Sequence, residues 1–262
     1  MSTATGLKPL IISAPFGNYV QPSGATATLG TFTRHNRPGR VWRILKTVRR
    51  YRRLGAWVNK IGLRNPGIDW LESKVASGKI DVSDKLVSIH GFDEQEWWGL
   101  LDAVARMNPL GVELNISCPN VGEMSWPAEL FSRAITSCAG STVIVKLPPV
   151  RYEEMLRQAL DAGVRVFHCC NTLPVPAGGM SGKPLKPLAL ICVGRVLESA
   201  SQRGVEIDVI GGGGITTPDD IDDYANAGAK RVAVGTMVMH PKYLWSDRGI
   251  RPLIDHAVRV LG

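Results

Sequence analysis

A cysteine between two asparagines is the part of this sequence whose residue types point most directly to chemistry. The stretch N-I-S-C-P-N follows a short apolar run and contains Asn115, Cys118 and Asn120. A thiol can take a proton from carbon or attack as a nucleophile, and amides can hydrogen-bond a neutral ligand. The alternatives are a buried packing residue, a disulfide half or a metal ligand, and the rest of the chain has to decide between them.

Glycine-rich stretches late in the chain predict an anion site. Residues 210–216 read I-G-G-G-G-I-T and residues 234–236 read V-G-T, each at the end of an apolar run. Glycines let backbone N–H groups approach a phosphate, although tight turns also require glycine. Lys146 ends another apolar run, where a lysine either meets an anion or extends to the rim. Together these features predict a phosphate-bearing, electron-rich cofactor beside Lys146.

Asparagines recur close to the ends of the apolar runs. Asn115, Asn120 and Asn171 each follow such a run, and Asn59 lies ahead of the third strand that we expect. Asparagine both donates and accepts hydrogen bonds, so several around one pocket suit a planar heterocycle with alternating N–H and C=O groups. Each of them taken singly is equally typical of a turn or a loop cap.

Eight short apolar runs alternate with helical stretches and organise these residues. Because the runs are continuously apolar, they favour parallel strands buried on both faces. The predicted strands cover residues 10–15, 27–32, 85–92, 111–117, 141–149, 164–172, 206–215 and 230–239. The alternation predicts an α/β fold, a single (β/α)8 TIM barrel domain over residues 1–262, with chemistry at the carboxyl ends of the strands. A doubly wound open sheet is the alternative, but its glycine-rich turn would follow the first strand.

Composition and charge narrow the class of protein. Of 262 residues 44% are hydrophobic, and no run is long enough to span a bilayer. No signal-peptide pattern begins the sequence, and five irregularly spaced cysteines fit a reducing compartment, so we expect a cytoplasmic protein without a membrane partner. No cysteine or histidine spacing indicates a metal site.

The net charge of +8 is concentrated in residues 34–53, which contain no acid. Such a stretch is either a solvated helix and loop or a surface for phosphate, nucleic acid or anionic lipid. The sequence leaves these alternatives open.

The chain resembles the FMN-dependent dihydroorotate dehydrogenases over most of its length. N-I-S-C-P-N and G-G-M-S-G-K-P-L-K-P-L-A-L form a specific pair. The resemblance covers residues 59–69, 113–121, 145–149, 171–172, 178–190, 210–215 and 234–236. It implies a (β/α)8 barrel that binds FMN and oxidises dihydroorotate to orotate, in pyrimidine biosynthesis, or acts on a related pyrimidine. A cysteine at this position is similar to the soluble class 1 enzymes, and the resemblance makes a homodimer the expected assembly.

The same resemblance implies roles for the candidate residues. Cys118 would be the catalytic base that removes a proton from the substrate carbon while hydride passes to FMN. Lys146 would face the flavin ring and stabilise charge on the reduced flavin. The other cofactor contacts would be Ala14, Thr31, Asn115, Gly182, Gly213, Gly214, Gly235 and Thr236. The pyrimidine would contact Asn59, Asn120, Asn171 and Thr172.

Gly30 is the main departure from the family's pattern. The family has a lysine at the end of the second strand, where residues 27–33 of this chain read A-T-L-G-T-F-T. Arg34, Lys46 or Lys60 would have to replace that charge. The segments after Thr172 and Val121 are also shorter than usual for the family.

Two alternative functions remain beside the oxidation of dihydroorotate. One is an FMN reductase of uracil in RNA, similar to the dihydrouridine synthases, in which the basic residues 34–53 would contact nucleic acid. The other is a catalytically weak flavin-binding homologue, which the absence of the lysine suggests.

Overall fold

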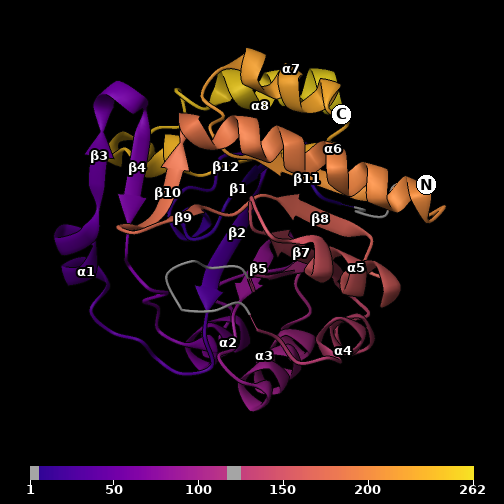
Figure 1. The fold of residues 1–262 in the computed structure, drawn as a ribbon. Coiled ribbons are helices and arrows are strands. Elements are labelled where there is room, and N and C mark those ends of the chain that lie inside the picture. The colour runs from indigo at the N-terminus through magenta and orange to yellow at the C-terminus, as the bar shows by residue number, and fades with distance from the viewer. Residues whose placement is uncertain (1–5, 117–124) are drawn as a thin grey trace.

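Eight parallel strands close into a barrel that helices surround (Figure 1). The computed structural model describes residues 6–116 and 125–262. The barrel strands are β1 (Leu10–Ile12), β2 (Ala25–Phe32), β5 (Leu86–Ile89), β6 (Gly111–Leu114), β7 (Thr142–Leu147), β8 (Val166–Cys169), β11 (Asp208–Gly212) and β12 (Arg231–Val234). Because β12 pairs in parallel with β1, the ring is closed. The predicted TIM barrel is confirmed and the open sheet is excluded.

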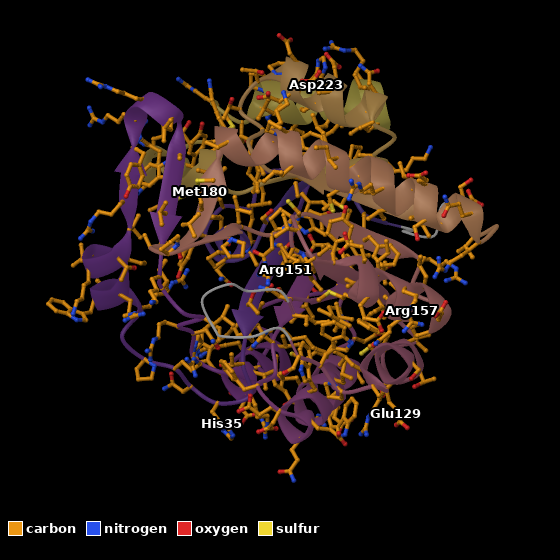
Figure 2. The ribbon with its side chains drawn as sticks, viewed as in Figure 1. His35, Glu129, Arg151, Arg157, Met180 and Asp223 are labelled. Atoms are coloured by element: carbon orange, nitrogen blue, oxygen red, sulfur yellow. The ribbon has the colours of Figure 1, made fainter. Side chains whose placement is uncertain are left out.

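Helices follow most of the barrel strands and pack on the outside of the barrel. They are α2 (Ile68–Ala76), α3 (Glu94–Met107), α4 (Leu130–Ser137), α5 (Glu153–Asp161), α6 (Lys186–Gln202), α7 (Pro218–Asn226) and α8 (Arg251–Leu261). Short 3-10 turns cover Phe16–Asn18, Arg52–Leu54, Lys183–Leu185, Thr236–Met239 and Pro241–Leu244. Charged side chains such as Arg157 on α5 and Asp223 on α7 point away from the barrel (Figure 2). Among the described helices, none combines the length and the apolar character needed to cross a bilayer.

A small antiparallel sheet, which no sequence pattern predicted, stands beside the barrel. Its strands lie in the order β3 (Arg49–Tyr51), β4 (Ala56–Asn59), β10 (Gly178–Gly182) and β9 (Leu173–Val175). Helix α1 (Arg40–Thr47) precedes β3 and lies at the outer edge of this sheet (Figure 1). The sheet therefore joins two segments that are far apart in the sequence and brings both to one side of the barrel.

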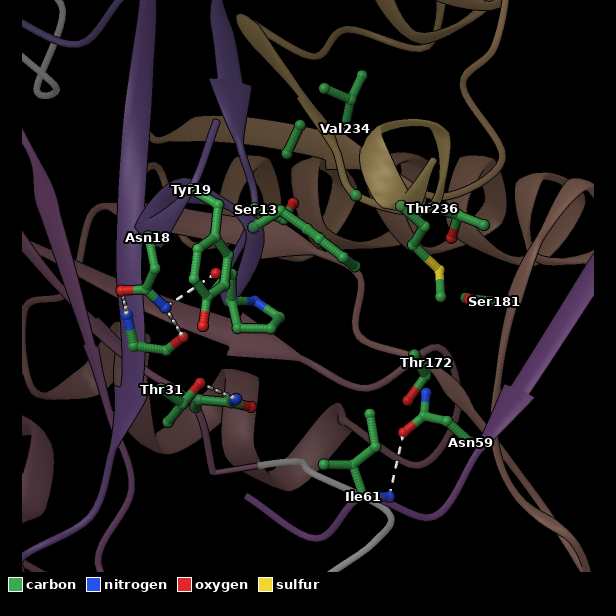
Figure 3. A pocket seen from close by; sticks show the side chains of 18 of the residues that line it. Ser13, Asn18, Tyr19, Thr31, Asn59, Ile61, Thr172, Ser181, Val234 and Thr236 are labelled. Atoms are coloured by element: carbon green, nitrogen blue, oxygen red, sulfur yellow. Dashed lines mark hydrogen bonds between the residues drawn. The ribbon is translucent and has the colours of Figure 1, made fainter. Parts of the chain in front are cut away.

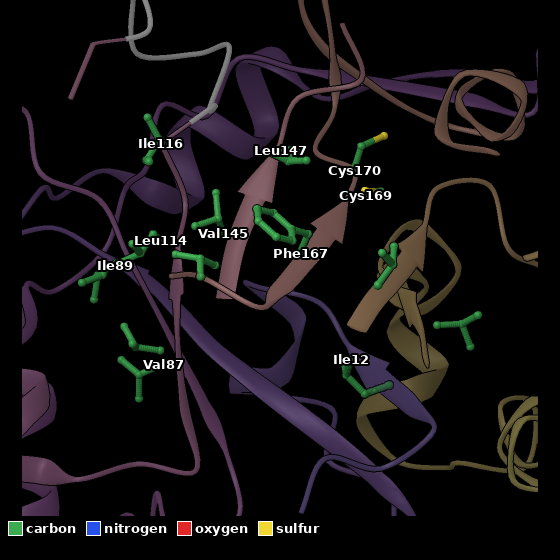
Figure 4. Close-up of a cluster of buried hydrophobic side chains, with 14 of the residues drawn as sticks. Ile12, Val87, Ile89, Leu114, Ile116, Val145, Leu147, Phe167, Cys169 and Cys170 are labelled. Atoms are coloured by element: carbon green, nitrogen blue, oxygen red, sulfur yellow. The ribbon is translucent and has the colours of Figure 1, made fainter. Parts of the chain in front are cut away.

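Alternate residues of each barrel strand divide between two apolar layers. Val145 and Leu147 of β7 belong to the large cluster between the barrel and the helices (Figure 4). Ile144 belongs to a smaller cluster, which fills the barrel interior together with Leu7, Ile11, Leu86, Val166, Ile210 and Ala233. Because side chains alternate along a strand, Lys146 points to the same side as Ile144, nearer the carboxyl end. The barrel interior is thus apolar at its base and polar above.

All the barrel strands except β2, which ends at Phe32 as predicted, are shorter at their carboxyl ends than the predicted ones. Strand β11 ends at Gly212, where the prediction ran to residue 215, and β12 ends at Val234, where it ran to residue 239. The residues in between leave the hydrogen-bonded ladder and form the turns around the barrel mouth. The apolar runs did not reveal this because the turn residues are themselves glycine and apolar side chains.

The start of α7 is held by a reciprocal cap. Thr217 accepts a hydrogen bond from the backbone N–H of Asp220, and Asp220 accepts from the backbone N–H groups of Thr216 and Thr217. Asp220 also pairs with Lys186 at the start of α6. This carboxylate therefore links two neighbouring helices directly behind the glycine-rich turn after β11.

Replacing Thr217 with Ala is expected to lower the free energy of unfolding by about 1 kcal/mol, because one cap acceptor is lost. Urea denaturation of the purified protein measures the change. Thr136→Ala, on the exposed face of α4, is the control and should change the stability by less than about 0.5 kcal/mol. Equal effects of the two variants would contradict the capping role.

Candidate active site

One cavity opens at the carboxyl ends of the barrel strands. Its volume is about 1370 Å³, larger than the roughly 300–1,000 Å³ typical of a site for one small ligand. Twelve of the predicted site residues line it: Ala14, Thr31, Asn59, Asn115, Lys146, Asn171, Thr172, Gly182, Gly213, Gly214, Gly235 and Thr236. Cys118 and Asn120 lie in residues 117–124, outside the described part of the chain. The structure thus brings together every predicted site residue that it describes.

The cavity lies between the barrel and the small sheet. Asn59 at the end of β4 and Thr172 before β9 lie on one side of it, and Thr31 of β2 lies on the barrel side (Figure 3). The amide oxygen of Asn59 accepts from the backbone N–H of Ile61, at 3.4 Å. Since Asn59 pairs with Gly179 of β10, the small sheet fixes its position relative to the barrel.

A chain of buried hydrogen bonds runs from the cavity into the barrel. Asn171 donates to the amide oxygen of Asn115 at 2.8 Å, and Asn115 donates to the Thr31 hydroxyl at 2.8 Å. The Ser88 hydroxyl lies 2.9 Å from that of Thr31 and donates to Glu113 at 2.9 Å. Because a carboxylate only accepts, Ser88 must receive the Thr31 proton. The order of donors is thereby fixed along the whole chain.

Glu113 is the charged end of this chain and is 1% exposed. Its two oxygens face Lys146 Nζ at 3.5 Å and His168 Nδ1 at 2.7 Å. Burial acts to raise the pKa of Glu113, but the Lys146 charge and the hydrogen bonds from His168 and Ser88 outweigh it and bring the pKa to about 2. Glu113 is therefore an anion at neutral pH.

Burial, and then the charge of Lys146, lower the pKa of His168 below its usual value. His168 is therefore neutral at pH 7, and its Nδ1 must carry the proton that it donates to Glu113. The other nitrogen, Nε2, lies toward Gly212 of β11, because a Cβ at Gly212 would come within 3.0 Å of it. Like Lys146, His168 lines the cavity.

Sequence patterns singled out neither Glu113 nor His168 nor Ser88. A signal existed in Glu113, since a charged residue in the middle of a fully apolar run needs a buried partner. That partner could not be identified from the sequence, because Lys146 lies 33 residues away. The register of the barrel strands brings these side chains together. Ser88 lies opposite Glu113 on the neighbouring strands β5 and β6, and Lys146 lies opposite His168 on β7 and β8.

The backbone at Gly30 has no room for a side chain. Gly30 has a φ of +98°, and a Cβ would lie 2.5 Å from the Ser88 carbonyl oxygen and 2.7 Å from the Phe32 backbone nitrogen. The amide of Asn18 binds both the N–H and the carbonyl of Gly30, each at 3.2 Å. The backbone at this position therefore requires glycine. Relative to the lysine expected from the family's pattern, both the charge and the backbone conformation differ.

None of the proposed replacements for that charge lines the cavity in the described structure. Arg34 pairs with Asp69, and neither Lys46 nor Lys60 reaches the cavity wall. Other basic residues do line it: Arg40, Arg50, Arg64, Lys79, Lys85, Lys146 and Lys183. Of these, Lys146 is 5% exposed and belongs to the barrel interior.

The glycine-rich turns fit a phosphate group. A Cβ at Gly214, whose φ is +76°, would lie 3.0 Å from the Lys186 Cβ and 3.1 Å from the Gly182 carbonyl oxygen. The backbone N–H groups of Gly214, Gly235 and Thr236 donate to no acceptor within the described residues. Because Asp220 already caps α7, these turns, and not the helix start, offer the donors that an anion would use.

Replacing Glu113 with Gln is expected to lower the free energy of unfolding by about 3–5 kcal/mol, because Lys146 would keep a buried charge without its anion. Chemical denaturation measures the change. Asp84→Asn removes the acid of the exposed pair with Lys85 and should cost less than about 1 kcal/mol. Unchanged stability of Glu113→Gln would show that the buried pair contributes nothing.

Replacing Gly30 with Ala should destabilise the protein by about 1–3 kcal/mol through overpacking, with backbone strain at positive φ in addition. Gly30→Lys meets the same contacts and should be no more stable. The control is Gly194→Ala on α6, where a Cβ meets nothing within 4 Å. That change should stabilise the protein by about 0.5–1 kcal/mol. Equal stability of Gly30→Ala and wild type would refute this reading of the turn.

Comparison with solved structures supports the fold. The DHODH of Eimeria tenella in complex with ferulenol superimposes with a TM-score of 0.73 at 18% sequence identity, covering 97% of this chain and 84% of that one. The ligand-free form of the DHODH from the same organism gives a TM-score of 0.69 at 19% identity, with 96% and 82% coverage. At this level of identity the similarity establishes a shared barrel fold.

Sequence comparison identifies the family as well as the fold. The catalytic subunit of dihydroorotate dehydrogenase B (NAD(+)) from Geotalea uraniireducens is 31% identical over 248 residues, which cover 84% of this chain and 78% of the relative. The subunit of the same name from Cutibacterium acnes is 31% identical over 238 residues, covering 77% and 73%. The family model for dihydroorotate dehydrogenase matches residues 17–256. The chain therefore belongs to the dihydroorotate dehydrogenase family.

Proposed function

We propose that this protein is an FMN-dependent oxidoreductase that oxidises dihydroorotate to orotate, in pyrimidine biosynthesis, or acts on a related pyrimidine. The observation that carries the proposal is that twelve predicted residues from separate segments of the chain, Lys146 among them, line one cavity. Membership of the family and 31% identity to a catalytic subunit of dihydroorotate dehydrogenase B support the same reaction, which acts on a CH–CH bond.

FMN is the proposed cofactor, and the residues present fit it. The N–H groups of Gly214, Gly235 and Thr236, which meet no acceptor in the described part of the chain, would bind the phosphate, with Gly182 and Gly213 giving it room. Lys146, Ala14, Thr31 and Asn115 would contact the ring system. Bound FMN would supply a hydride acceptor, and the Lys146 cation would stabilise the negative charge that then develops.

The pyrimidine would bind between the barrel and the small sheet. Asn59, Asn171 and Thr172 line that side of the cavity and, with Asn120, would pair with its alternating N–H and C=O groups. Asn171 donates to Asn115 and accepts from the backbone N–H of Thr172 at 2.9 Å, so its amide is held in one orientation at the cavity wall. Cys118 would take the proton from the substrate carbon as the catalytic base.

Glu113 would position Lys146 in this reaction without touching the substrate. The carboxylate holds the ammonium group from inside the barrel, while Lys146 also lines the cavity. We further propose that the chain forms one barrel domain and works as a cytoplasmic homodimer. The two hydrophobic clusters support the first point, because both belong to the barrel and its helices.

The decisive experiment is an anaerobic titration of the purified protein with dihydroorotate. The protein should be yellow as purified, and its visible flavin absorption should disappear as dihydroorotate is added. If flavin binds but stays oxidised, dihydroorotate is not the substrate, and the protein is a flavin-binding homologue without this activity. Protein without flavin, even after incubation with FMN, would overturn the cofactor as well.

Replacing Cys118 with Ala should slow the reduction of the flavin by dihydroorotate by about 10²–10⁴-fold, because the base is lost. Stopped-flow absorption under anaerobic conditions measures the rate, and the flavin spectrum shows that the cofactor is still bound. Cys138→Ala, a thiol buried at the end of α4, is the control and should keep the wild-type rate. Equal rates for Cys118→Ala and wild type would show that Cys118 is not the catalytic base.

A further inference from the structure

Helix α1 carries its apolar face on the outside. Val41, Trp42 and Leu45 are 72%, 67% and 71% exposed, although they are the large apolar residues of the helix. No residue of this eight-residue helix is buried. A surface helix normally turns this face toward the core. Here the opposite arrangement leaves an exposed apolar strip on α1. The helix itself lies at the edge of the molecule (Figure 1).

Hydrogen bonds from the polar face hold the helix in this orientation. Arg43 donates to the carbonyl oxygen of Lys60 at 2.6 Å, and the Thr47 hydroxyl accepts from the Lys60 backbone N–H at 3.1 Å. Arg40 donates to the Tyr19 hydroxyl at 2.7 Å. Positions 40, 43 and 47 share one side of a helix, so the opposite side, with Val41 and Leu45, must face outward.

Exposed basic side chains follow the apolar strip along the chain. Strand β3 is exposed along its whole length, and with the turn after it adds Arg49, Arg50, Arg52 and Arg53. Leu54, 62% exposed, and Tyr51, 46% exposed, lie among them. Residues 34–53 contain nine Lys or Arg residues and no acid. We call the exposed residues Val41, Trp42, Leu45, Leu54, Arg49, Arg52 and Arg53 the docking face.

We propose that the docking face binds an anionic lipid surface. Aromatic and aliphatic side chains on the outer face of a short helix can enter the boundary between headgroups and acyl chains, while arginines beside them contact lipid phosphates. A second copy of this chain fits poorly, because a two-fold contact would bring the same arginines together. Nucleic acid also fits poorly, because Arg40 and Arg43 are turned inward and the outermost side chains of α1 are apolar, two of the three being aliphatic.

The docking face borders the cavity. Arg40, Ile44, Val48 and Arg50 line the cavity as well as belonging to α1 and the residues after it. Docking would therefore bring one wall of the cavity to the lipid surface. This contact is independent of the reaction proposed above, because it involves no residue assigned to cofactor or substrate.

The test is co-sedimentation of the full chain, as purified, with vesicles. Wild type should bind mixed phosphatidylcholine–phosphatidylglycerol vesicles much more strongly than pure phosphatidylcholine vesicles. Trp42→Ser/Leu45→Ser should weaken binding to the mixed vesicles about tenfold or more, since two large apolar side chains no longer enter the lipid. The control is Ile191→Ser/Val258→Ser, at apolar positions of α6 and α8 that are 54% and 51% exposed, which should bind like wild type.

Charge provides a second, separate readout. Arg49→Gln/Arg53→Gln should weaken binding to the anionic vesicles about fivefold for each charge removed, and high salt should reduce the difference. All these side chains are exposed, so thermal melting should give wild-type midpoints for every variant.

Absence of binding to anionic vesicles would overturn the proposal, as would equal binding to both kinds of vesicle. Retention of single-stranded RNA that Trp42→Ser/Leu45→Ser leaves unchanged, without vesicle binding, would assign the surface to nucleic acid instead. Self-association that the same variant abolishes, again without vesicle binding, would assign it to a second copy. Neither outcome concerns flavin reduction, so the titration with dihydroorotate tests the proposed reaction independently of this surface.

Discussion

The buried carboxylate of Glu113 is the constraint on which the upper barrel depends. A carboxylate that is 1% exposed is tolerated only if its charge and lone pairs are met. Lys146, His168 and Ser88 meet them from three different strands. The register of those strands is thereby tied to the ion cluster, because a shift by one residue would turn the partners to the outer face. The same cluster holds Lys146 where a bound cofactor would meet it.

The barrel interior is apolar at one end of its axis and polar at the other. Ile144, Val166 and Ile210 belong to the apolar cluster that fills the base of the barrel interior. One layer nearer the mouth, polar side chains take the inward positions, and hydrogen bonds link Glu113 to Asn171 at the cavity wall. Because every donor in this chain has a defined acceptor, the amides at the cavity are pre-oriented before any ligand arrives. The small sheet adds Asn59 from the opposite side.

Two local structures beside the barrel, the backbone at Gly30 and helix α1, are each held in place by their own hydrogen bonds. Gly30 occupies a backbone position whose N–H and carbonyl both bind the Asn18 amide and which has no room for a Cβ. Helix α1 presents its apolar side to the outside because Arg40, Arg43 and Thr47 anchor the other side. Both features border the same cavity.

The sequence by itself determined the barrel and its eight strands, and the resemblance to the family pointed to most of the residues that line the cavity. The barrel could be predicted because continuous apolar runs indicate burial on both faces. Lys146, the glycine turns, Asn115 and Asn171 could be singled out because they follow the ends of those runs. Only the tertiary structure decided the partners: Glu113 meets Lys146 across 33 residues, and β4 pairs with β10 across more than a hundred. Such pairings depend on strand register and on sheet neighbours. Local pattern also could not decide which face of α1 looks outward, because that choice rests on hydrogen bonds to residues distant in sequence.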